Sequence, residues 1–183
     1  PADVAWKLVA SNLSDLAAKT CRPVGLLLSF MLGDEAWNTR FAAGLGEALA
    51  AFDAPLLGGD TVSAPSPDAP KVIGLTALGQ PRRDPPPSRA DAAPGQALWI
   101  TGQCGAALAG FEALQAGSDD QTLTAPYRRP VPRVAEGQAL APVAGAMMDL
   151  SDGLLLDAAR MAEASGTTIS IETCLVPVHP ALT

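Results

Sequence analysis

Strands and helices alternate along this sequence of 183 residues, which predicts an α/β or α+β fold in two subdomains. A proline-rich stretch without periodicity, residues 81–94, interrupts the alternation and is expected to be an interdomain crossing. Hydrophobic residues make up 48% and charged residues 17%, enough apolar surface for a packed core. We therefore expect one domain over residues 1–80, the crossing over 81–94 and a second domain over 95–183.

The first domain is predicted to contain two amphipathic helices and three strands. Apolar side chains recur at helical spacing over residues 4–19 and 35–52. Continuous apolar runs predict buried strands over residues 24–31 and 71–78. A short strand over residues 54–57 is expected to end on Gly58-Gly59-Asp60-Thr61.

The second domain is predicted to alternate three strands with three helices. Apolar and β-branched runs predict strands over residues 97–101, 145–150 and 168–172. Helices are expected from about residue 105 to 116, over 133–140 and over 153–164, where Gly166 ends the last one. Residues 117–132 are polar, contain prolines and are predicted to form a loop.

The charge balance is acidic, with 12 Lys and Arg against 19 Asp and Glu and a net charge of -7. This balance argues against binding to nucleic acid or to an anionic membrane, because both need a basic face. Three widely spaced cysteines predict neither a disulfide framework nor a zinc site and indicate a reducing cytoplasm. The longest apolar stretch, residues 24–32, is much shorter than the ~20 residues of a membrane helix.

Two acidic residues of the first domain are candidate functional residues, each with an ordinary alternative. Asp15 is expected on the polar face of the first helix, where it could simply pair with Lys19 one turn later. Asp60 follows two glycines that would let a ligand approach the backbone, but Gly-Gly-Asp is also common in plain turns.

A second acidic group lies in Met148-Asp149-Leu150-Ser151-Asp152-Gly153. Ser151 or Asp152 could be the N-cap of the following helix, which explains one of the three polar residues. Carboxylates separated by a single turn are better explained by a shared divalent cation, because such a cation takes oxygen ligands and offsets their repulsion.

Taken together, these motifs resemble those of the thiamine-monophosphate kinases, members of the ATP-binding superfamily that includes aminoimidazole ribonucleotide synthetase. The matching segments occur in the family's order: Asp3-Val4-Ala5-Trp6-Lys7, Asn12-Leu13-Ser14-Asp15-Leu16-Ala17-Ala18, Leu57-Gly58-Gly59-Asp60-Thr61, Ser88-Arg89-Ala90, Pro94-Gly95, Thr101-Gly102, Pro132-Arg133 and Asp149-Leu150-Ser151-Asp152-Gly153-Leu154. The resemblance implies that each subdomain is a mixed sheet packed by helices.

The resemblance also implies a function and a set of site residues. The reaction would be a Mg²⁺-assisted, direct in-line transfer of the γ-phosphoryl group of ATP to thiamine monophosphate, which gives thiamine diphosphate. Asp15, Asp60, Asp149 and Asp152 would ligate several Mg²⁺ ions, and Asp15 and Asp152 would be the catalytic residues. Gly59, Asp60, Arg89 and Ser151 would contact ATP. The family resemblance further implies a cytoplasmic homodimer in thiamine diphosphate biosynthesis, with no nucleic-acid or membrane partner.

Two departures from the family pattern are expected to matter. Where the family continues Ala-Ala-Met-Gly-Ala, this sequence has Ala17-Ala18-Lys19-Thr20-Cys21, which replaces a glycine by Thr20. The resemblance also implies that the sequence is a piece of a longer enzyme and lacks an acidic N-terminal segment and a C-terminal part.

Two alternatives to the kinase function are considered. One is a related ATP-dependent enzyme that activates an amide or carbamoyl oxygen, and the other is a catalytically inactive scaffold.

Overall fold

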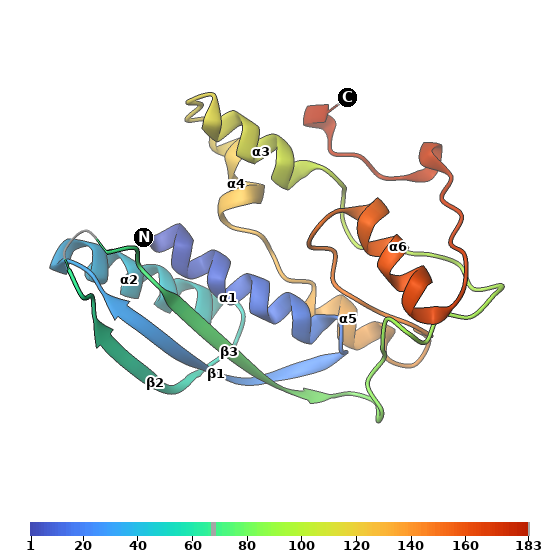
Figure 1. Cartoon of the computed structure of the whole chain (residues 1–183), viewed down its shortest axis with the longest axis horizontal. Helices are drawn as coiled ribbons and strands as arrows, with labels where there is room; N and C mark the ends of the chain where they lie inside the picture. The colour runs from blue at the N-terminus through green and yellow to red at the C-terminus, as the bar shows by residue number, and fades with distance from the viewer. Residues whose placement is uncertain (67–68, 183) are drawn as a thin grey trace.

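The computed structural model describes residues 1–66 and 69–182. A three-stranded mixed sheet with the order β2-β1-β3 forms the first half of the molecule. The central strand β1 (Cys21–Leu32) pairs parallel with β2 (Leu56–Ser63) and antiparallel with β3 (Ile73–Pro81). Helices α1 (Ala2–Ala17) and α2 (Glu35–Ala51) cover one face of this sheet (Figure 1). The predicted α/β fold is confirmed.

The core lies between the two helices and the sheet. The expected helical spacing places the apolar side chains on the faces of the helices that point toward the sheet. Ala5, Val9 and Leu13 of α1 are fully buried and pack with Leu26 of β1 and Phe41 of α2. Phe41 also stacks on Phe30 and Trp37 at centroid distances of 4.7 and 5.1 Å. This side of the sheet is therefore a closed hydrophobic layer that fixes the orientation of α1.

Paired residues share a face of the sheet, so the register also identifies the residues on its other face. Phe30 faces the core, and it pairs with Thr61 of β2 and Ile73 of β3. The outer face is therefore formed by the alternate residues, and it carries the following side chains: Leu27, Ser29 and Met31 of β1, Asp60 and Val62 of β2, and Thr76 and Leu78 of β3.

Up to residue 182, the second half contains the α-helices α3 (Ala106–Gln115), α4 (Gln121–Arg128), α5 (Val134–Leu140) and α6 (Leu154–Ser165). Helices α4 and α5 pack on α1, and α3 packs on α4. Two short 3₁₀ turns, Thr173–Leu175 and Pro180–Leu182, follow α6. The division into two domains at residues 81–94 stays a prediction, because α4 and α5 of the second half pack directly on α1 of the first half.

Three expectations for the second half are wrong. The segments 97–101, 145–150 and 168–172 form no strand and join no sheet within the described residues, so the expected second sheet is not formed. The predicted loop over 117–132 contains α4, whose N-terminus is capped by Asp120. The helical spacing over residues 153–164 predicts that Leu155 faces inward, but in α6 its side chain is exposed.

The ion pairs and hydrogen bonds at the end of α4 attach the second half to the first. Arg129 forms ion pairs with Asp3 (2.6 Å) and Glu47 (2.8 Å). Trp6 donates a hydrogen bond through its indole Nε1 to the carbonyl of Pro130 (2.9 Å). Among residues 1–66 and 69–182, no helix is long and apolar enough to cross a membrane.

Candidate functional site

Asp15 lies on the exposed side of α1, near the helix C-terminus. Although the residue is exposed, partial desolvation of the Asp15 carboxyl by its neighbours raises its pKa above the usual value, the negative charge of Asp149 raises it further, and Lys19 partly offsets both. The fold thus places the carboxylates of Asp15 and Asp149, from distant parts of the chain, close enough for their charges to interact.

Lys19 does not form the ion pair with Asp15 that the sequence left open. Among the described residues its ammonium donates instead to the carbonyl of Pro87 (3.0 Å), in the proline-rich crossing. The next residue, Ser88, accepts a hydrogen bond through its carbonyl from the Met147 amide (3.3 Å). The end of α1, the crossing and the segment before Asp149 therefore meet at one place. Lys19 was missed because its spacing from Asp15 suggested an ordinary helix-surface pair.

Arg89, a predicted ATP contact, lies in this same crossing. Its side chain is exposed, and its carbonyl accepts a hydrogen bond from the hydroxyl of Ser165 (2.8 Å) at the end of α6. The crossing is thereby held between α1 and α6, with the guanidinium on the surface.

Ser151 and Asp152 do not cap α6, so that interpretation is wrong. The N-cap is Gly153, whose φ of +106° places it in a region that side chains rarely adopt, and no side chain in the part of the chain that the structure describes caps the helix. The Asp152 carboxylate instead forms an ion pair with Arg160, and the Asp152 amide donates to the Asp157 carboxylate (2.9 Å). Asp157 and Arg160 were both missed, because an acid in a first helical turn is ordinarily explained by the helix dipole.

Gly59 and Asp60 lie within β2 rather than in a turn after it, which corrects the expected end of that strand. A Cβ at Gly59 would lie 1.9 Å from the carbonyl oxygen of Leu28, so only glycine permits this pairing of β1 with β2. Asp60 lies on the outer face of the sheet and accepts a hydrogen bond from the Thr61 amide (2.9 Å). Helix α1, which carries Asp15, covers the opposite face.

The four predicted ligands therefore do not form one compact cluster. Across residues 1–66 and 69–182, no group of three or more His, Cys, Asp or Glu side chains could hold a metal ion. Asp15 and Asp149 remain as a pair whose charges interact. Mg²⁺ is commonly held by one or two carboxylates together with substrate phosphates, so the pair fits this ion.

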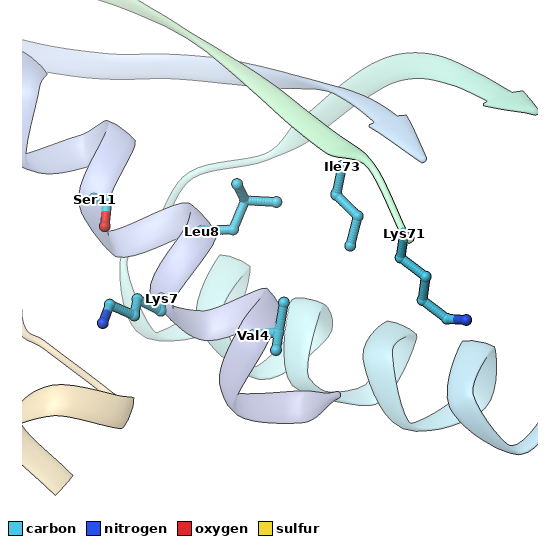
Figure 2. Close-up of a pocket in the computed structure, with 6 residues that line it drawn as sticks. All are labelled: Val4, Lys7, Leu8, Ser11, Lys71 and Ile73. Atoms are coloured by element: carbon cyan, nitrogen blue, oxygen red, sulfur yellow. The ribbon is translucent and has the colours of Figure 1, made fainter. Parts of the chain in front are cut away.

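An open pocket of about 400 Å³ lies between α1 and the start of β3 (Figure 2). Its lining combines apolar side chains with two lysines and a serine: Val4, Lys7, Leu8, Ser11, Lys71 and Ile73. Both lysines also lie over aromatic rings, Lys7 over Tyr127 at 3.4 Å and Lys71 over Trp37 at 5.2 Å. None of the predicted site residues lines this pocket, although Ser11 is one helical turn from Asp15.

Comparisons with known proteins agree with the resemblance seen in the motifs. Residues 1–80 match the family described as AIR synthase related protein, N-terminal domain. The thiamine-monophosphate kinase of Escherichia coli (strain K12) is 36% identical over 100% of this chain, which covers 57% of that protein. The corresponding enzyme of Caulobacter vibrioides is 38% identical over 97% of this chain, which covers 51% of its length. The chain thus spans little more than half the length of these curated relatives.

Solved structures show the same relationship. A structure of AaThiL complexed with AMPPCP and TMP superposes with a TM-score of 0.89 at 27% identity, over 100% of this chain and 60% of that one. The thiamine-monophosphate kinase of Stenotrophomonas maltophilia K279a gives a TM-score of 0.88 at 32% identity, over 99% of this chain and 60% of that one. The hydrogenase maturation protein HypE, at 22% identity and a TM-score of 0.81, shares the fold, over 98% of this chain and 58% of that one. This chain is therefore similar over its full length to the thiamine-monophosphate kinases, and its residues 1–80 match the AIR synthase related N-terminal domain.

Proposed function

We propose that the protein carrying this chain transfers the γ-phosphoryl group of ATP to thiamine monophosphate, producing thiamine diphosphate and ADP. The similarity to thiamine-monophosphate kinases over the full chain carries this proposal. The fold shared with AaThiL, whose structure holds AMPPCP and TMP, supports it independently.

In the proposed reaction, a phosphate oxygen of thiamine monophosphate attacks the γ-phosphorus of ATP. A new P–O bond forms as the bond from the γ-phosphorus to the β,γ-bridging oxygen breaks, and ADP leaves with the electron pair. Such a transfer depends on alignment and charge neutralisation more than on a protein nucleophile. Bound Mg²⁺ would supply neutralisation of the phosphate charges.

We assign the residues of this chain to that reaction as follows. Asp15 and Asp149 hold a Mg²⁺ ion beside the crossing, with Asp15 and Asp152 as the catalytic carboxylates. Asp60 and Asp152 bind further ions from the sheet and from the start of α6. The backbone of Gly59 and the side chains of Asp60, Arg89 and Ser151 contact the nucleotide. The interaction of Asp15 with Asp149 supports the first assignment.

The quaternary structure and the location are part of the same proposal. The outer face of the sheet carries Leu27, Val62 and Leu78, which are all substantially exposed, and we assign this face to a homodimer interface. The three cysteines are free thiols, which supports a cytoplasmic location.

Thiamine diphosphate formation from ATP and thiamine monophosphate, measured with the protein that carries this chain, tests the proposal. We expect turnover that requires Mg²⁺ and that Asp152→Asn abolishes, whereas Asp119→Asn, an exposed acid before α4, leaves turnover unchanged. ATP hydrolysis that occurs only with an amide or carbamoyl acceptor would instead identify the alternative enzyme class. Absence of any turnover in the folded protein would identify a scaffold.

A further inference from the structure

Asp157, in the first turn of α6, is buried to 1% exposure, and no other acidic residue of the described chain is buried. Burial of a carboxylate is costly unless hydrogen bonds and a counter-charge satisfy it. The helix dipole does not explain this burial, because an exposed acidic residue in the first turn interacts with the dipole equally well.

The hydrogen bonds and ion pair of the Asp157 carboxylate connect it to Asp152, directly and through Arg160. One carboxylate oxygen accepts a hydrogen bond from the Asp152 amide (2.9 Å), and the other pairs with Arg160 (3.0 Å). Arg160 in turn forms an ion pair with the carboxylate of Asp152. Asp157 thus restrains both the backbone and, through Arg160, the side chain of Asp152.

The turn that Asp157 restrains has few other restraints of its own. Gly153 provides no side chain, and among the described residues no side chain caps the α6 N-terminus. Ser151 and Asp152 are exposed. A predicted ligand carboxylate on such a turn needs a rigid support to keep its geometry.

We propose that Asp157 is a positioning residue that sets the place of Asp152 for a divalent cation. It does so by accepting the Asp152 amide hydrogen bond and by holding Arg160 against the Asp152 carboxylate. This inference rests on the proposed function only in taking Asp152 as a cation ligand.

Asp157→Asn tests the proposal with a side chain of nearly the same size. Its neutral oxygen is a weaker acceptor and no longer pairs with Arg160. In the cation-free protein, we expect faster hydrogen exchange at the Asp152 amide. With Mn²⁺ as the probe, we expect binding weakened by roughly 3- to 10-fold for Asp157→Asn and by at least about 10-fold for Asp157→Ala.

A neighbouring substitution separates positioning from a general loss of stability. Ala158→Gly destabilises α6, because glycine is a poorer helix former than alanine, but leaves the contacts of Asp157 in place. We expect Mn²⁺ binding by this variant to match that of the parent. Equal weakening by Ala158→Gly and Asp157→Asn would overturn the positioning role.

The Asp152→Asn variant separates the two ways in which the inference can fail. Suppose that Asp152→Asn weakens Mn²⁺ binding, whereas Asp157→Asn matches the parent both in Mn²⁺ binding and in hydrogen exchange at the Asp152 amide. Only the positioning role of Asp157 is then overturned. If Asp152→Asn itself leaves Mn²⁺ binding unchanged, the assignment of Asp152 as a ligand is overturned as well. Should Asp157→Ala fail to fold, the Asp157→Asn results decide alone.

Discussion

Asp15 and Asp149 illustrate how a pair of carboxylates becomes a candidate cation site. Each could be singled out in the sequence by its surroundings, one on the polar face of a helix and the other after an apolar run. Their proximity depends on the packing of the crossing between α1 and the segment before Asp149, through Lys19 and Ser88. Contacts between such distant segments leave no local pattern, so the sequence could nominate the residues but could not say which of them meet.

Replacement of Asp15 by Asn is expected to stabilise the cation-free chain at neutral pH. The pKa of Asp15 is raised in the folded state, first by partial desolvation and then by Asp149, so its ionised form opposes folding. The parent therefore gains stability as the pH falls through that raised pKa, and its difference from Asp15→Asn shrinks. Thermal unfolding of both proteins from about pH 7 to about pH 4 measures this trend.

The same pair of proteins also reports on the cation. Saturating Mn²⁺ should raise the melting temperature of the parent more than that of Asp15→Asn, because the variant lacks one ligand. Asp119→Asn is the control, since this exposed acid lies outside the candidate site. If Asp15→Asn melts at a lower temperature than the parent at neutral pH without cation, the ionised Asp15 carboxylate does not oppose folding, and the expectation is wrong.

At the scale of elements, the turn from α1 into β1 shows the consequence of a departure from the family pattern. Thr20 lies where the family resemblance implies a glycine, and it has a φ of +55° in the left-handed region. It is fully buried, and its hydroxyl has no hydrogen-bond partner within the described structure. A β-branched side chain is costly in this conformation, and so is a buried hydroxyl that is not satisfied.

Thr20→Gly is therefore expected to stabilise the fold by about 1 kcal/mol. It removes the backbone strain and the unsatisfied hydroxyl, and this gain outweighs the larger conformational entropy that glycine gives the unfolded chain. Urea unfolding followed by tryptophan fluorescence measures the change in the free energy of unfolding. Asp53→Gly is a matched control, since Asp53 also has a positive φ (+48°) but is exposed and belongs to a residue type that tolerates it. Its effect should stay within about 0.5 kcal/mol. An unchanged or lower stability of Thr20→Gly would show that the turn is not strained.

The elements of the first half could be predicted well because their periodicity reflects burial on one side. Residues 24–31 fall within β1, and residues 4–19 and 35–52 overlap α1 and α2 almost completely. Gly58 to Thr61 were expected in a turn because glycine and aspartate are rare in strands, yet the close approach of Leu28 requires a glycine there. Helix α4 was missed because Pro126 suggests a loop, whereas packing on Gly110 of α3 stabilises it.

At the scale of the whole molecule, the two halves differ in how completely their apolar residues are covered. The first half buries one face of its sheet under α1 and α2 (Figure 1). In the second half, apolar runs predicted as strands find no pairing partner within the described residues, and Trp99 is 84% exposed. A strand requires a neighbour to satisfy its backbone, so composition alone could not predict whether a second sheet forms.

The outer face of the sheet offers the last prediction, which concerns association. Val62 lies on this face in β2 and is 45% exposed, so a lysine there is compatible with the folded monomer. In a dimer that buries the face, the same ammonium would lose its hydration without a partner. We expect Val62→Lys to shift the chain from dimer to monomer in size-exclusion chromatography with light scattering. Leu108→Lys, at a 58% exposed apolar position on α3, should leave the molar mass unchanged. Equal masses for the parent and both variants at every concentration would exclude the outer face as the dimer interface.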